Sequence, residues 1–133
     1  MKTILVLEDE PLVMKLMRHV LKRFDVISAT TAEQALQVFG GGSQVDLLVT
    51  DVRLPRLSGI QVALRIRSEL PAFPVLLMSG YLADGWRDVD TFDLERLGSE
   101  SVVLLQKPFE TQALLKAVYD LIGKPHAEIA RTA

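Results

Sequence analysis

Two patterns of apolar and polar positions alternate along the chain. Short apolar runs recur five times and are typical of strands buried on both faces of a sheet, whereas the segments between them repeat apolar residues at helical spacing. In the first such segment, Leu12 and Leu16 belong to the apolar stripe. The predicted strands span 3–7, 24–29, 45–51, 74–78 and 102–105, and the regular helices span 11–23, 32–39, 60–70 and 110–122.

Strands that alternate with helices imply a parallel sheet covered by helices on both faces. Right-handed crossovers leave few topologies, and the flavodoxin-like strand order 2-1-3-4-5 is the natural one. We therefore predict an α/β fold, a flavodoxin-like (βα)5 three-layer sandwich with a parallel five-stranded sheet. Residues 1–123 form this domain, and residues 124–133, which have little apolar pattern, are expected to be a flexible tail.

The segment that should supply the fourth helix is irregular. Residues 81–88 show no clean helical stripe, so a loop that contains Trp86 is predicted there. The helix itself begins at Asp90 or Thr91, and Gly98 lies past its end. We therefore expect a shortened or displaced fourth helix preceded by a loop.

Composition and charge exclude several classes of function. The net charge of -2 gives no electrostatic reason to expect binding to nucleic acid or to anionic membranes. The absence of cysteine excludes disulfides, thiolate catalysis and cysteine-bound zinc. No signal-peptide core or membrane-spanning apolar run occurs in the sequence, so the expectation is a soluble cytoplasmic protein.

Polar residues end four of the predicted strands. Glu8 and Asp9 follow the first strand, Asp51 ends the third, Ser79 follows the fourth and Lys107 follows the fifth. Each residue alone has an ordinary structural explanation as a helix cap, a turn residue or a solvated charge. In the predicted strand order they converge at the carboxyl edge of the sheet, where ligands bind in open α/β folds. The conjunction therefore indicates a functional site.

The chemistry of such a site follows from its residue types. Three adjacent carboxylates repel one another unless a cation joins them, and oxygen ligands with open positions suit Mg²⁺. A metal-bound Asp51 can attack an electrophilic phosphorus atom to form an aspartyl-phosphate. Lys107 would supply positive charge to the phosphoryl oxygens, and Ser79 can donate a hydrogen bond to one of them.

Several separate motifs of the sequence resemble one known family, the response-regulator receiver domain of two-component signalling. The resemblance covers roughly residues 2–122. The motifs are Leu7-Glu8-Asp9-Glu10, Asp51-Val52-Arg53-Leu54-Pro55 with Ser58-Gly59, Met78-Ser79-Gly80-Tyr81, and Lys107-Pro108-Phe109. This resemblance implies a phospho-accepting signalling domain and not an enzyme, one that assists only its own phosphorylation and dephosphorylation.

The resemblance assigns roles to the acidic residues. Asp51 would accept a phosphoryl group from a phosphohistidine on a sensor histidine kinase or a histidine phosphotransfer protein. Asp9 and Asp51 would bind Mg²⁺ directly, Glu8 would act through water, and the backbone carbonyl of Arg53 would add a ligand. No other cofactor is implied.

The resemblance also assigns roles to the residues that follow the last two strands. Ser79 and Lys107 would hold the phosphoryl group, and the Lys107–Pro108 peptide bond would be cis. The fourth helix, fifth strand and fifth helix would form the face that contacts a separate effector or another receiver. Neither direct nucleic-acid binding nor membrane binding is expected.

Three positions bear on how phosphorylation would change the structure and on how long the phosphoryl group would persist. The family usually has an aromatic residue three positions before the lysine, and this chain has Leu104 there. The usual coupling of hydroxyl and aromatic side chain is therefore altered, and Trp86 fluorescence is expected to report phosphorylation instead. Arg53 and Tyr81, each two residues after a site residue, would hinder attacking water, so slow self-dephosphorylation is expected.

Alternative functions remain open on the sequence alone. A haloacid-dehalogenase-type phosphatase, which also uses an Asp nucleophile, typically needs a second Asp where this chain has Arg53. A flavodoxin-like nucleotide or flavin binder needs a phosphate loop after a strand, whereas residues 40–42 follow a helix. A degenerate receiver would act as an interaction module without phosphorylation. The sequence names neither the kinase nor the output, and the chain is either a stand-alone protein or a piece of a hybrid kinase.

Overall fold

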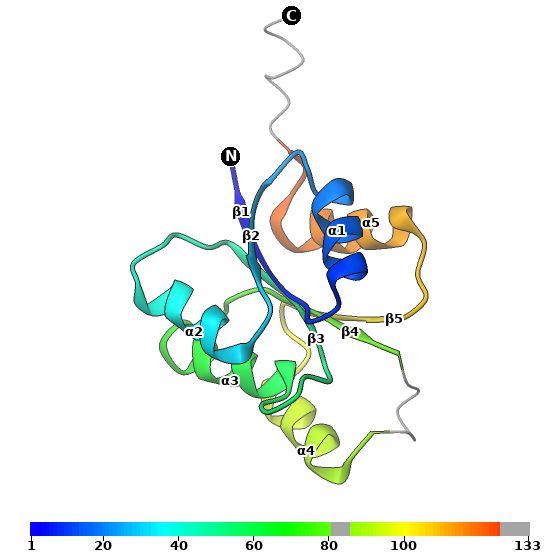
Figure 1. Ribbon diagram of the computed structural model, residues 1–133. Coiled ribbons are helices and arrows are strands. Elements are labelled where there is room, and N and C mark those ends of the chain that lie inside the picture. The colour runs from blue at the N-terminus through cyan, green and yellow to red at the C-terminus, as the bar shows by residue number, and fades with distance from the viewer. Residues whose placement is uncertain (81–85, 126–133) are drawn as a thin grey trace, which may run out of the picture.

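The computed structural model describes residues 1–80 and 86–125 of the 133-residue chain. Strands and helices alternate through these ranges (Figure 1). The elements are β1 (Thr3–Leu7), α1 (Pro11–Val20), β2 (Asp25–Ala29), α2 (Ala32–Gly40), β3 (Leu47–Asp51), α3 (Gly59–Glu69), β4 (Val75–Ser79), α4 (Asp88–Leu97), β5 (Val102–Gln106) and α5 (Thr111–Ile122). None of the helices within these ranges is long and apolar enough to span a lipid bilayer.

The five strands form one parallel sheet in the order β2-β1-β3-β4-β5, which confirms the predicted topology. The register places Leu7 of β1 beside Thr50 of β3 and Asp51 beside Met78 of β4. Ser79, the last residue of β4, pairs with Gln106 of β5. The carboxyl ends of β1, β3, β4 and β5 therefore meet at one edge of the sheet.

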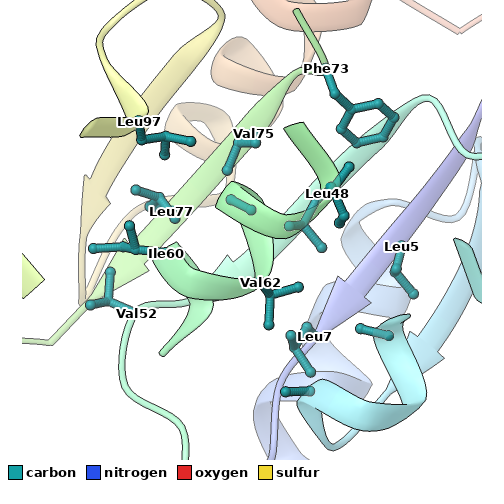
Figure 2. Close-up of a cluster of buried hydrophobic side chains, with 14 of the residues drawn as sticks. Leu5, Leu7, Leu48, Val52, Ile60, Val62, Phe73, Val75, Leu77 and Leu97 are labelled. Carbon is teal, nitrogen blue, oxygen red and sulfur yellow. The ribbon is translucent and has the colours of Figure 1, made fainter. Parts of the chain in front are cut away.

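Helices cover both faces of the sheet and enclose two apolar clusters. Helices α1 and α5 lie on one face, and α2, α3 and α4 lie on the other (Figure 1). Successive side chains of a strand point to opposite faces. In β1, Ile4 and Val6 pack with α1 and α5, whereas Leu5 and Leu7 pack with α2 and α3. Figure 2 shows the cluster that contains Leu5 and Leu7, in which Leu77 lies beside Ile60.

The first helix differs from its sequence prediction in length and in orientation. It ends at Val20 rather than Arg23, although Leu21 just past its end is fully buried. The inward face is formed by Met14 and Met17. Leu12 and Leu16, which the apolar stripe placed inside, are 82% and 53% exposed. The apolar stripe of the sequence is therefore wider than the face of α1 that is buried against the sheet.

The fourth helix begins at Asp88, two residues before the earlier of the two predicted starts, and has 10 residues, as many as α1. The predicted start of the helix is therefore two residues too late, and its shortening relative to other receivers stays a prediction. Arg87 makes a bidentate ion pair with the buried Asp90, in which Nε lies 3.0 Å from Oδ2 and Nη2 lies 2.9 Å from Oδ1. This ion pair stabilises the first turn of the helix. Gly98 follows the helix as predicted. Most of the predicted loop, residues 81–85, lies outside the described residues.

Helix α4 packs mainly against α3 and is tied to it at its carboxyl end. The guanidinium group of Arg67 in α3 donates hydrogen bonds to four backbone carbonyls that surround this end. The acceptors are Phe73, Leu97, Glu100 and Ser101. Leu104 of β5 is left 45% exposed beside α4. The predicted displacement of α4 relative to other receivers stays a prediction.

Candidate functional site

The predicted site residues converge at the carboxyl edge of the sheet. They surround a cavity of about 400 Å³, and the side chain of Glu8 lies fully buried beside it. The cavity is lined by Asp9, Glu10, Asp51, Arg53, Ser79, Gly80 and Lys107. Four separate strands deliver these residues because a parallel sheet ends all its strands on the same side.

Lys107 forms the electrostatic centre of this cavity. Its ammonium nitrogen lies 3.1 Å from a carboxylate oxygen of Glu8 and 3.0 Å from Oδ2 of Asp51. Burial alone would lower the pKa of Lys107, but its hydrogen bond to Asp51 and the charges of Asp51 and Glu8 outweigh burial and raise that pKa. The lysine therefore stays protonated and presents a fixed positive charge to the cavity.

The carboxylates of the cavity outnumber its single lysine. One oxygen of each of Glu8, Asp9 and Asp51 lies within 4.8 Å of the others. Burial raises the pKa of Asp51, the bond with Lys107 opposes this, and the charges of Asp9 and Glu10 raise it further. Burial also raises the pKa of Glu8, against the hydrogen bond that it accepts from the Glu10 backbone. The ionised forms of Glu8 and Asp51 are therefore less favourable in this site than they are in water.

The donor set of this cluster fits a hard divalent cation. A cation among the three carboxylates would relieve the repulsion that, together with burial, raises the pKa values of Glu8 and Asp51. Its ligands would all be oxygen atoms, and the cavity beside them is open to water, which suits Mg²⁺ better than a softer transition metal. Arg53, whose backbone carbonyl was the predicted fourth ligand, lines the same cavity.

The position of Asp51 is fixed by the backbone around it. Thr50, fully buried, donates its hydroxyl to the carbonyl oxygen of Asp51 at 2.9 Å. Val52 donates its N–H to Met78 at 2.8 Å and accepts the N–H of Gly59 at 2.9 Å. These bonds close the loop between β3 and α3 and hold the carboxylate at the mouth of the cavity.

Gly59 allows this close approach of α3 to the end of β3. A Cβ atom at position 59 would overlap the backbone oxygen of Asp51 and the side chain of Thr50. We predict that Gly59→Ala lowers the free energy of unfolding by about 2 kcal/mol, because backbone atoms must shift to admit the methyl group. Urea denaturation measures this change. Gly40→Ala is the matched control, since nothing lies within 4 Å of its added Cβ, and an equal loss there would contradict this explanation.

Ser79 is 3% exposed and links the fourth and fifth strands at the site. Its backbone carbonyl accepts the N–H of Lys107 at 2.7 Å. Its hydroxyl accepts a hydrogen bond from the indole N–H of Trp86 at 3.1 Å. The Lys107–Pro108 peptide is cis, as predicted. Tyr81, the remaining predicted residue of this region, lies outside the described residues.

Two contributors to the site were not predicted to be site residues from the sequence. Glu10 lines the cavity, bonds to Glu8 through its backbone and places a further negative charge near Asp51. The acidic run 8–10 was a visible signal for this residue. Trp86 contacts Ser79, but no sequence pattern foretells this contact, because it depends on the path of the chain between the two residues.

Comparisons with known proteins agree on one family. Residues 4–119 match the family model of the response regulator receiver domain. The chain is 39% identical over 80 residues to the alkaline phosphatase synthesis transcriptional regulatory protein PhoP of Bacillus subtilis, covering 59% of this chain and 33% of PhoP. It is 28% identical over 130 residues to the autoinducer 1 sensor kinase/phosphatase LuxN of Vibrio campbellii, covering 96% of this chain and 14% of LuxN. The chain thus spans a third or less of these relatives.

Solved structures have the same fold. A response regulator receiver protein from Sinorhizobium medicae superposes with a TM-score of 0.78 at 27% identity, over 94% of this chain and 97% of that one. The response regulator TrrA of Thermotoga maritima, solved in complex with Mg²⁺ and BeF, gives a TM-score of 0.74 at 27% identity, over 92% and 100% of the two chains. The chain therefore belongs to the response regulator receiver domain family of two-component signalling.

Proposed function

We propose that this receiver domain accepts a phosphoryl group on Asp51 from a phosphohistidine of a sensor histidine kinase or a histidine phosphotransfer protein. The observation that carries the proposal is the position of Asp51. Its carboxylate lies 3.0 Å from the Lys107 ammonium group and within 4.8 Å of carboxylate oxygens of Glu8 and Asp9, at the open edge of the sheet. No other described carboxylate combines this setting with access to the cavity.

The chemistry of the transfer follows from these neighbours. A carboxylate oxygen of Asp51 attacks phosphorus, so that a new oxygen–phosphorus bond forms and the nitrogen–phosphorus bond to the donor histidine breaks. The histidine nitrogen leaves with the electron pair of that bond. Lys107, which pairs with Asp51 before transfer, neutralises charge on the phosphoryl oxygens, and it remains anchored by Glu8. Ser79 supplies a hydroxyl donor from the neighbouring strand.

Glu8, Asp9, Asp51 and the backbone carbonyl of Arg53 would hold Mg²⁺. The ion would supply positive charge at the phosphoryl group and would offset the repulsion among the carboxylates. The structure of Thermotoga maritima TrrA in complex with Mg²⁺ and BeF supports the presence of such a site in this family. Here the support from this chain is the all-oxygen donor cluster and the raised pKa values of Glu8 and Asp51 within it.

Labelling with a small phosphodonor separates the possible functions. Incubation with acetyl phosphate and Mg²⁺ is expected to add one phosphoryl group to the intact protein, measured by mass spectrometry. A degenerate receiver that acts only as an interaction module would remain unmodified. An aspartyl-phosphate phosphatase would consume acetyl phosphate continuously without accumulating a stable phosphoprotein. Either result would contradict the proposal.

The lifetime of the phosphoryl group is expected to be long. Arg53 is exposed and lines the cavity, so its large side chain would hinder an attacking water there. Tyr81 lies outside the described residues, and its part in this shielding stays a prediction. The output would pass through the face formed by α4, β5 and α5 to a separate effector or another receiver. Val89, Phe92 and Leu104 expose apolar side chains on α4 and β5.

Two exposed leucines are suited to hold the phosphodonor protein. Leu12 and Leu16 lie one turn apart on α1, which starts directly after Glu10 at the rim of the cavity. We predict that Leu12→Ala with Leu16→Ala slows phosphotransfer from a phosphorylated kinase roughly ten-fold, because apolar contact with the donor is lost. Labelling by acetyl phosphate should be unchanged, since that donor is too small to need the contact.

The control for this pair is Leu70→Ala. Leu70 is also exposed, at 48%, but it follows α3 at the end away from the cavity. Radiolabel transfer from a purified phospho-kinase measures both variants. Equal transfer rates in the wild type and the double variant would contradict docking on α1, and slower labelling by acetyl phosphate would indicate damage to the site instead.

A further inference from the structure

The only tryptophan of the chain lies against the hydroxyl of the phosphoryl site. Trp86 stands two residues before α4 and packs, partly buried, against the apolar cluster on the α3 side of the sheet. Its indole nitrogen lies 3.1 Å from Oγ of Ser79. Ser79 is at the same strand face as Val75 and Leu77, which belong to that cluster, because alternate residues of a strand share a face. The two side chains therefore meet on the α3 side of the sheet.

The direction of this hydrogen bond follows from the groups that form it. An indole N–H is only a donor, so the Ser79 oxygen must be the acceptor. A hydroxyl that accepts in one direction turns its own proton toward another acceptor. It also becomes a stronger donor, because hydrogen bonds in a chain polarise one another. Trp86 thus controls both the direction and the donor strength of the Ser79 hydroxyl.

Ser79 also lines the cavity that contains Asp51. Met78, which precedes Ser79, pairs with Asp51 across the sheet, and both Ser79 and Asp51 line the cavity. Lys107 lines it as well and donates its backbone N–H to Ser79. An anionic oxygen attached to Asp51 would enter the space that these residues border. It would be an acceptor for the hydroxyl that Trp86 orients.

We propose that Trp86 is a positioning residue for phosphoryl binding, whose indole N–H orients the Ser79 hydroxyl toward an oxygen of the phosphoryl group on Asp51. This inference rests on the proposed function of Asp51. Trp86 directly precedes Arg87, which caps α4, so the same bond connects the occupied site to the start of that helix. Leu104, an aliphatic side chain, has no group that could form such a hydrogen bond.

The test is a titration with beryllofluoride and Mg²⁺, followed by ¹⁹F NMR, on four proteins and one control variant. The four proteins are the wild type, Trp86→Phe, Ser79→Ala and the double variant. Phenylalanine retains an aromatic ring but has no N–H, and Trp86→Phe is expected to weaken binding roughly three- to ten-fold. In the Ser79→Ala background, the same change should have no further effect, because Trp86 acts through that hydroxyl. Phe92→Leu, at an exposed aromatic residue of α4, should bind like the wild type.

A spectroscopic measurement tests the contact without altering Trp86. The single tryptophan gives a single indole N–H signal in a ¹H–¹⁵N spectrum, and Ser79→Ala should move this signal upfield because its acceptor is removed. An unmoved signal would overturn the contact. Binding to Trp86→Phe that equals or exceeds binding to the wild type would overturn the positioning role, as would an equal loss in the Ser79→Ala background. Absence of binding by the wild type would instead overturn the proposed function, and this inference with it.

Discussion

Asp51→Asn is expected to abolish labelling by a phospho-kinase and by acetyl phosphate. An amide has the shape of the carboxylate but lacks its nucleophilic oxygen, so no acyl phosphate can form. The fold should survive, because burial and the charges of Asp9 and Glu10 already disfavour the ionised form of Asp51. Removing the charge of Asp51 should stabilise the fold, whereas loss of its hydrogen bond with Lys107 should destabilise it. The net change in unfolding free energy should stay within about 1 kcal/mol.

The matched control for this substitution is Asp46→Asn. Asp46 is an aspartate next to β3 at the opposite end of that strand, where its carboxylate accepts the N–H of Thr3 at 2.8 Å. It should be labelled like the wild type. Phosphorylation is measured by radiolabel and by mass spectrometry of peptides, and unfolding by circular dichroism. Undiminished labelling of Asp51→Asn in a folded protein would place the acceptor elsewhere and overturn the assignment.

The parts of the fold that the sequence predicted well share a simple physical cause. A strand that is buried on both faces must be largely apolar, so it appears in a sequence as a short apolar run. The run that ends at Asp51 has this form, as do the runs that end at Leu7 and Ser79. Once the strand order was fixed by right-handed crossovers, the meeting of Glu8, Asp51 and Lys107 followed.

Helix α4 shows where prediction from apolar periodicity fails. Its inward positions include the buried Asp90 and Asp93, whereas Val89 and Phe92 are 45% and 60% exposed. Arg87 compensates Asp90 through an ion pair with both of its oxygens, so the burial is tolerated. Periodicity alone misses such a helix because it assumes that the apolar side faces the core. The same assumption placed Leu12 and Leu16 inside, although they are exposed on α1.

Mg²⁺ is expected to stabilise the folded domain by relieving repulsion at the site. The ion binds the native arrangement of Glu8, Asp9 and Asp51 and has no comparable site in the unfolded chain. At a concentration one hundred times its Kd, it should add about 2.7 kcal/mol to the free energy of unfolding. For a domain of this size, this corresponds to a rise in Tm of about 10 °C. Thermal melts in Mg²⁺ and in EDTA measure the difference.

Asp9→Asn separates the metal from other effects of salt. This substitution removes a ligand but also removes a charge that raises the pKa of Asp51, so the variant in EDTA should be at least as stable as the wild type in EDTA. The gain from Mg²⁺ should then largely vanish. A wild-type melt that is indifferent to Mg²⁺ would contradict the site, and an undiminished gain in Asp9→Asn would place the ion elsewhere. Asp46→Asn leaves the cluster of Glu8, Asp9 and Asp51 intact. This variant should therefore keep the full stabilisation by Mg²⁺.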